Sequence, residues 1–275
     1  MHKIEDNMEV YKPKDSNEKI VKNIVIAAHK DDGEMIGIKA IDDSFKKDES
    51  MVMIILTNGS GCPRVGEFKS VSDEDMVEIR TAEQKRAAEI GRYNCLYLLE
   101  HSSKEVQDMH TNIKNELVEI LKKYPEIENI YIHNPFDKHN THVGACELAI
   151  AAIKELYADG ALKKLSKVLG VEVWRGLDWL PDKYKVTIDT TGAEFISQNI
   201  MSVFVSQNSA KRYDEAISNR RLANATFDAS HESNICTSLM YAIDLMGVVQ
   251  DVNKNLSDLL TENLDLFEKE LRKNL

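Results

Sequence analysis

The sequence predicts an α/β fold in which helices cover a mostly parallel β-sheet. Two observations carry this prediction: short apolar runs rich in β-branched residues recur along the first half of the chain, and helical segments separate them. Strands that alternate with helices run parallel, because a crossover helix returns the chain to the same end of the sheet. We therefore expect layers of helices packed on a sheet.

Six segments have the pattern of β-strands, at residues 24–28, 51–56, 95–99, 130–133, 168–174 and 184–188. The first two are continuous apolar runs, which are typical of strands buried on both faces. The last two flank a turn that contains Pro181.

Helices are expected between and after these strands, at residues 72–91, 104–124, 141–159, 193–205 and 210–223. Ser72 and Asp75 have the spacing of a capping box, and Gly91 ends that helix. Pro125 stops the next helix, because proline cannot continue one.

The end of the chain carries apolar residues at spacings of three and four from Leu239 to Leu271, which is the pattern of an amphipathic helix. Such a helix packs either on its own core or on another subunit, and the pattern does not distinguish the two. We expect an N-terminal extension at residues 1–20, a main domain at 21–230 and a C-terminal helical extension at 231–275.

The composition is that of an ordinary globular protein, with 43% apolar and 29% charged residues among 275. The net charge of −11 repels phosphate backbones, so nucleic acid is not an expected partner. No apolar run approaches the ~20 residues of a membrane-spanning helix, and the N-terminus has no apolar signal region. We therefore expect a cytoplasmic protein without membrane insertion, whose four cysteines are reduced.

The loop after the first predicted strand crowds one imidazole and three carboxylates into a single turn: His29, Asp31, Asp32 and Glu34. Like charges this close repel one another unless a cation offsets them. Zinc accepts both imidazole nitrogen and carboxylate oxygen. A polar loop in which aspartate caps a helix is the alternative explanation.

The loop after the fourth predicted strand holds three histidines, His133, His139 and His142. Ligands of open parallel sheets bind outside the carboxyl ends of the strands, and both polar loops lie there. With no cysteine nearby, two histidines and one aspartate would leave a coordination position open, as in catalytic sites. His133 ends a strand and is expected in the core or cleft wall, as are Trp174 and Trp179.

Both loops resemble the signature of the LmbE-like, PIG-L-type zinc deacetylases. Residues 28–34 correspond to the family motif AHPDDE, and residues 137–142 correspond to D-x-HPDH. Further matches are the TNG at residues 57–59, the RxxE at 80–83 and the SQ pair at 206–207. Order and spacing agree over about residues 22–228, which makes the resemblance nearly full-length.

The resemblance implies zinc ligation by His29, Asp32 and His142. Iron(II) is the alternative metal, because a set of two histidines and one carboxylate serves both. The resemblance also implies a Rossmann-like three-layer fold with a mostly parallel sheet, followed by the C-terminal helical extension.

The family pattern further assigns roles to the neighbouring polar residues. Asp31 is expected to act as general base, and His139 to stabilise the oxyanion or protonate the leaving amine. Substrate contacts are expected from Arg80, Asn134 and Asp137.

The sequence departs from the family pattern at four places, and the last of them bears on substrate identity. Lys30 replaces the motif proline, and Asn140-Thr141 replaces Pro-Asp. The family's Gly-Gly is missing near Ile38, and its substrate-binding acid has only Glu100 or His101 nearby.

These observations predict a zinc-dependent hydrolase that removes an acetyl group from an N-acetylglucosamine-type amino sugar by attack of metal-bound water. A metal-dependent amidohydrolase for a non-sugar N-acyl substrate and a non-catalytic ligand-binding protein are the alternatives. A Rossmann-type nucleotide binder is disfavoured, because the first loop lacks GxGxxG. The expected partner is a small N-acetylated molecule, and self-association into a homo-oligomer stays open.

Overall fold

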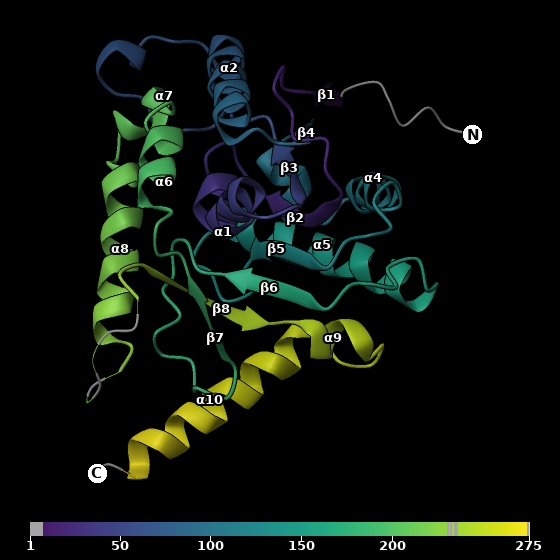
Figure 1. The fold of residues 1–275 in the computed structure, drawn as a ribbon, viewed down its shortest axis with the longest axis vertical. Helices are drawn as coiled ribbons and strands as arrows, with labels where there is room; N and C mark the ends of the chain where they lie inside the picture. The colour runs from purple at the N-terminus through teal and green to yellow at the C-terminus, as the bar shows by residue number, and fades with distance from the viewer. Residues whose placement is uncertain (1–7, 230, 232, 234–235, 274) are drawn as a thin grey trace.

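One mixed sheet of eight strands runs through the computed structural model, which describes residues 8–229, 231, 233, 236–273 and 275 (Figure 1). Its spatial order is β1-β4-β3-β2-β5-β6-β8-β7. The strands are β1 (Glu9–Tyr11), β2 (Val21–Ala27), β3 (Ser50–Thr57), β4 (Cys95–His101), β5 (Asn129–His133), β6 (Lys167–Val171), β7 (Lys185–Asp189) and β8 (Leu239–Asp244).

The centre of the sheet is parallel and its two edges are antiparallel. Strands β4, β3, β2, β5 and β6 all pair in parallel, whereas β1 is antiparallel to β4 and β8 is antiparallel to both β6 and β7. The mostly parallel sheet predicted from the sequence is therefore present in the centre. The strand order reverses at β2, because β3 pairs with one side of it and β5 with the other. In open parallel sheets such a reversal leaves a crevice at the carboxyl ends of the strands.

Helices cover both faces of this sheet (Figure 1). They are α1 (Asp32–Lys46), α2 (Asp73–Gly91), α3 (Ser103–Gln107), α4 (Thr111–Leu121), α5 (Asn140–Ala158), α6 (Glu194–Met201), α7 (Val205–Asn208), α8 (Tyr213–Phe227), α9 (Met246–Gln250) and α10 (Leu256–Lys273). Alternate residues of β2 enter two separate cores: Ile24 and Ile26 pack with α4 and α5, and Val25 and Ala27 pack with α1. The prediction that this strand is buried on both faces is confirmed.

The single helix expected over residues 104–124 is wrong, because two helices occupy this stretch. Met109 separates α3 from α4 and has φ 58°, a left-handed conformation that no α-helix contains. Close to this break, α3 packs tightly on α5. A Cβ atom on Gly144 of α5 would lie 2.5 Å from the carbonyl oxygen of Val106 in α3.

The expectation of one helical stripe from Leu239 onward is also wrong, because its first residues form β8. All of Leu239–Ile243 are buried, so this run is apolar on both faces and fits an interior strand. A short apolar run contains helical spacings as well, which is why periodicity alone misassigned it. Strands β1 and β8 come from the two predicted extensions, so residues outside 21–230 complete the sheet.

Among the residues that the structure describes, no helix combines the length and the apolar character that crossing a bilayer requires.

Candidate active site and metal centre

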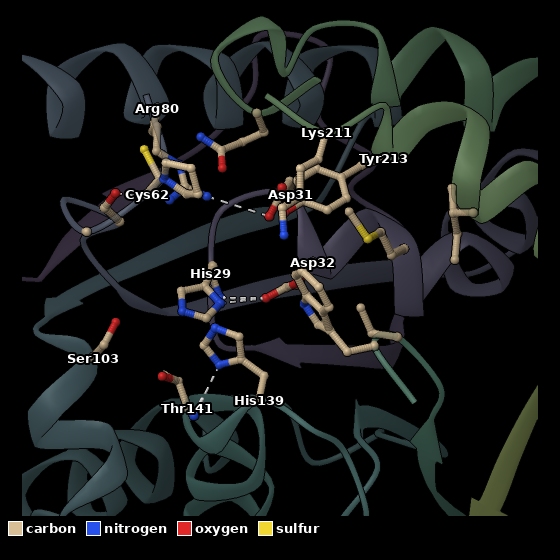
Figure 2. Close-up of a pocket in the computed structure, with 18 of the residues that line it drawn as sticks. His29, Asp31, Asp32, Cys62, Arg80, Ser103, His139, Thr141, Lys211 and Tyr213 are labelled. Carbon is tan, nitrogen blue, oxygen red and sulfur yellow. Dashed lines mark hydrogen bonds and ion pairs between the residues drawn. The ribbon is translucent and has the colours of Figure 1, made fainter. Parts of the chain in front are cut away.

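A cavity of about 720 Å³ opens at the carboxyl ends of β2, β3 and β5 (Figure 2). Its floor comes from the loops that follow these strands, with His29 after β2, Gly59 after β3 and His139 after β5. Its outer wall comes from Trp174, in the segment after β6, and from Tyr213 at the start of α8. The two polar loops identified in the sequence therefore meet in the same cavity.

The loop after β2 is held in a conformation that amino acids other than glycine rarely adopt. Asp31 has φ 103°, and such a residue costs on the order of 1–3 kcal/mol unless its surroundings fix it. Its backbone N–H donates to Gln84 Oε1 at 3.2 Å. Arg80 donates to the carbonyl oxygen of Lys30, one residue earlier. The turn presents Asp31 and Asp32 to different neighbours.

The three predicted metal ligands converge on one carboxylate oxygen. Asp32 Oδ2 lies 2.9 Å from His29 Nδ1 and 3.1 Å from His142 Nε2. The buried Nε2 atom of His142 has no hydrogen-bond partner of acceptable geometry among the described residues. Two imidazole nitrogens and one carboxylate oxygen at this spacing suit zinc or iron(II), so the residues fit such an ion.

Two further histidines border this cluster. Candidate ligand atoms lie within 4.8 Å of one another in two overlapping groups, His29–His139–His142 and Asp32–His133–His142. However, His133 Nε2 accepts a hydrogen bond from the backbone N–H of Ala28 at 3.0 Å, which occupies the nitrogen nearer Asp32. His133 is fully buried behind the cluster.

His139 lies at the cavity floor, next to His29 (Figure 2). Its ring stacks on that of His142, with centroids 4.6 Å apart, and meets the ring of His29 edge-on at 4.9 Å. His139 also caps α5, because its Nδ1 accepts from the backbone N–H of Thr141 at 3.3 Å. A neutral ring with Nδ1 as acceptor carries its proton on Nε2.

Asp137 and Asn134, expected as substrate contacts, lie behind the cavity wall instead. Asp137 Oδ2 is 3.3 Å from His142 Nδ1 and accepts from the backbone N–H of Trp174 at 3.2 Å. Carboxylates in this position orient the rings of metal-binding histidines. Asn134 is fully buried and bonds to the backbone of Val171 and Phe136, which shapes the turn after β5.

Arg80 lines the cavity, but its guanidinium group is largely engaged by the protein. It donates to the carbonyl oxygen of Gly59 at 3.0 Å and lies 3.6 Å from Asp31 Oδ1. Glu83, one turn later, accepts from the backbone and hydroxyl of Ser206 at 2.8 and 2.6 Å. The RxxE and SQ segments of the sequence thus touch, and together they tie α7 to α2.

The pKa values of the two adjacent aspartates, Asp31 and Asp32, shift in opposite directions. Burial and the charge of Asp32 raise the pKa of Asp31 well above its usual value. Burial would also raise the pKa of Asp32, but His142 and His29 outweigh it and hold that pKa well below the usual value. Burial and the neighbouring His142 lower the pKa of His139 to about 4, so its ring is neutral at pH 7.

Sequence reasoning missed most of the outer wall of the cavity. Lys211, Tyr213 and Arg220 line it, but they belong to a helical segment with no local pattern that indicates a site. Trp174, expected in the core or the cleft wall, does line the cavity. Cys62 lies in the loop after β3, half-buried at the cavity edge.

Comparison with protein-family models finds one match. Residues 24–153 match the family model PIG-L, described as GlcNAc-PI de-N-acetylase. No curated protein matches the chain in sequence.

Several solved structures share the fold. N,N'-diacetylchitobiose deacetylase from Pyrococcus horikoshii has a TM-score of 0.65 and 14% identity, with 90% of this chain and 92% of that one covered. The 4-carboxy-2-hydroxymuconate hydratase GalB from Pseudomonas putida KT2440 has a TM-score of 0.62 and 17% identity, with coverages of 86% and 100%. The zinc-inhibited form of teicoplanin deacetylase Orf2 has a TM-score of 0.57 and 12% identity, with coverages of 81% and 98%.

At these identities the structural likenesses establish the fold alone, whereas the family match covers the strand and helix that carry each polar loop. It covers most of β2 and the loop with His29 and Asp32, and β5 and the loop with His139 and His142. Residues 24–153, which include both polar loops, therefore match the PIG-L family model.

Proposed function

We propose that this chain is a metal-dependent hydrolase that removes the acetyl group from the nitrogen of an N-acetylated amino sugar. One observation carries the proposal: Asp32 Oδ2 lies within 3.1 Å of both His29 and His142 at the floor of the cavity. The family description, GlcNAc-PI de-N-acetylase, supports the reaction and the substrate class. The diacetylchitobiose deacetylase with the same fold supports the same class.

His29, Asp32 and His142 would hold the ion, which we propose to be zinc, with iron(II) as the alternative. When bound, such an ion supplies Lewis acidity: it polarises a carbonyl group and lowers the pKa of water from 15.7 to about 7. Asp137 fixes the ring of His142 from behind, so that its free Nε2 points toward Asp32.

Asp31 is the proposed general base. Its strained backbone turns its carboxylate away from Asp32 and toward Arg80, which lies 3.6 Å from Oδ1 and orients it at the cavity floor. From there the carboxylate takes a proton from the attacking water. The water oxygen adds to the acetyl carbon, the C–N bond breaks, and acetate and a free amine leave.

His139 is proposed to stabilise the oxyanion that forms during this attack. Its Nδ1 is occupied by the backbone N–H of Thr141, so Nε2–H is the donor that faces the cavity. A donor of this kind contributes on the order of 100-fold in rate. The leaving nitrogen is then protonated, either by the proton that Asp31 has accepted or by His139.

Hydration is a second candidate function, because GalB, which shares the fold, is a hydratase. The deciding experiment loads the purified protein with Zn²⁺ or Fe²⁺ and measures acetate released from N-acetylglucosamine conjugates and from N-acetyl amino acids. We expect the wild-type protein to release acetate from the sugar conjugates and the Asp31→Asn variant to release none. Release from the amino acids alone would overturn the substrate class. Absence of acetate from every substrate would overturn the deacetylase proposal and direct attention to hydration.

A further inference from the structure

One peptide group of the loop after β2 is held from both sides by a single helix. This peptide joins Lys30 to Asp31, the proposed base. Its carbonyl oxygen accepts from Arg80, and its N–H donates to Gln84 Oε1 at 3.2 Å. Arg80 and Gln84 are four residues apart in α2, so they lie about one turn from each other on the same face of that helix. Helix α2 therefore fixes the plane of the peptide that leads into Asp31.

Gln84 is fixed in turn by a buried acid and a buried phenol. Its Nε2 donates to Glu34 Oε1 at 2.6 Å, and the hydroxyl of Tyr93 donates to the same oxygen at 2.7 Å. The side chains of Gln84, Glu34 and Tyr93 are all buried, so water does not replace a hydrogen bond that is lost there. A primary amide suits the middle position, because it accepts from the Asp31 N–H and donates to the carboxylate at the same time.

The backbone conformation of Asp31 makes this support necessary. Its φ of 103° lies in a region that a residue with a Cβ atom adopts only when its surroundings impose it. Rotation about the N–Cα bond toward a common φ would swing the carboxylate to a different place on the cavity floor. Arg80 lies beside this carboxylate, 3.6 Å from Oδ1 (Figure 2). The N–H has one hydrogen, and Gln84 takes it.

We propose that Gln84 is a positioning residue for the reaction, and that the chain of hydrogen bonds from Tyr93 through Glu34 to Gln84 sets the place of the Asp31 carboxylate. The inference rests on the proposed role of Asp31 as general base. None of the three supporting side chains lines the cavity, so their effect on the reaction passes through the loop that carries Asp31.

The first test measures the kinetics and the metal content of Gln84→Met. Methionine keeps the length of the side chain and removes both hydrogen bonds. The kcat for acetate release should fall on the order of 100-fold, because misplacing a reacting group by about 1 Å has an effect of that size. The KM and the bound metal should stay near their wild-type values, since the proposed metal ligands keep their places.

Asn23→Leu is the matched control, because Asn23 is a buried amide near the amino end of β2, whereas the cavity lies at the carboxyl end. Its Nδ2 donates to Glu49 Oε1 at 3.0 Å, and its Oδ1 accepts from Asn129 at 3.0 Å. It thus joins a donor to a carboxylate, as Gln84 does. Asn23→Leu should lower the Tm and leave kcat near the wild-type value. Equal kcat values for Gln84→Met and Asn23→Leu would overturn the inference.

A double-mutant cycle tests whether Tyr93 acts through Gln84. Tyr93→Phe removes the hydroxyl that holds Glu34 and should lower kcat by about 5-fold, which corresponds to one hydrogen bond. In the Gln84→Met background the same change should have little further effect, because the link to Asp31 is already broken. Additive effects of the two changes on kcat would contradict the proposed chain. If Gln84→Met does not fold, Tyr93→Phe takes its place in the comparison with Asn23→Leu.

Crystal structures of the wild type and of Gln84→Met separate this inference from the proposed function. In the variant, the φ of Asp31 should leave the region near 103° and its carboxylate should move relative to Asp32. An unchanged φ and carboxylate would refute the inference even when the wild type releases acetate. If the wild type releases no acetate from any N-acetylated sugar, the proposed function fails, and the place of Asp31 in the two structures still decides the inference.

Discussion

Replacement of Lys30 by methionine removes a buried charge from the loop that carries the proposed base. Lys30 lies between His29 and Asp31 and is fully buried. Its ammonium group donates to the carbonyl oxygen of Asn58 at 2.9 Å and to Thr81 Oγ1 at 2.8 Å. It pairs with Glu100 at 2.9 Å, so all three of its protons have partners. The side chain thus joins the loop after β2 to the loop after β3, the end of strand β4 and helix α2.

Methionine keeps most of the stem of Lys30 and deletes the ammonium group, which leaves three acceptors without their donor. Breaking a buried ion pair by removing one partner costs about 3–5 kcal/mol. The Glu100 side chain is 20% exposed, so water partly screens it and the lower end applies, about 3 kcal/mol. For a chain of this length that loss corresponds to a Tm lower by about 5 °C.

The assay combines thermal and urea unfolding of Lys30→Met, Glu100→Gln and the double variant, together with acetate release at saturating substrate. The double variant should recover at least about 1 kcal/mol relative to the sum of the single effects, because the unpaired carboxylate is gone. Turnover should fall in Lys30→Met, since the loop that positions Asp31 loses an anchor.

Lys22→Met is the matched control, because Lys22 also belongs to the β2 region and pairs with Glu128 at 3.0 Å, but at the surface. Exposed pairs contribute about 0–1 kcal/mol, so this variant should unfold close to the wild type. Equal destabilisation by the two lysine substitutions, or additive effects of the Lys30 and Glu100 changes, would refute the role given to the buried pair.

Three further outcomes follow from the site and its surroundings. Asp31→Asn should abolish acetate release but keep the bound metal, whereas His142→Ala should lose both. Metal analysis alongside the rate measurement checks this. Near-normal turnover by Asp31→Asn would contradict its assignment as the general base. Gly59→Ala should lower both Tm and turnover, because Gly59 has φ 80° and a Cβ atom there would lie 2.6 Å from Arg80 Nη1; unchanged values would show that Arg80 moves freely. Burial raises the pKa of Glu172 above 4.5 in the folded state, so its contribution to stability is present below that pH and is lost as the pH rises through the folded pKa. The wild-type stability should therefore fall relative to Glu172→Gln in urea titrations from pH 4.5 upward, and a constant difference would contradict this.

The central strands and the two polar loops were predictable because the signals that define them are local. A continuous apolar run such as residues 51–56 has few alternatives to an interior strand, and β3 occupies it. His29 and His139 each follow such a strand, and parallel strands end at one edge of the sheet, so their meeting followed from topology.

Other features depended on contacts that no local pattern contains. The break at Met109 lies where α3 packs on Gly144 of α5. Asp137 was expected to face the substrate, but the position of His142 Nδ1 directs its carboxylate behind the wall. Lys211 and Tyr213 reach the cavity because Glu83 ties Ser206 to α2, a contact that spans more than a hundred residues.

The place of β8 in the sheet has a consequence for how the chain reaches its native state during synthesis. Strand β7 pairs with β8 and with no other strand among the described residues, and β8 ends at Asp244. Until that late segment has left the ribosome, β7 has no neighbour and the edge of β6 stays bare. Closure of the sheet therefore waits until residues 239–244 have been synthesised. A version truncated near residue 230 would leave β6 and β7 without the strand that pairs with both, and unpaired strands favour aggregation.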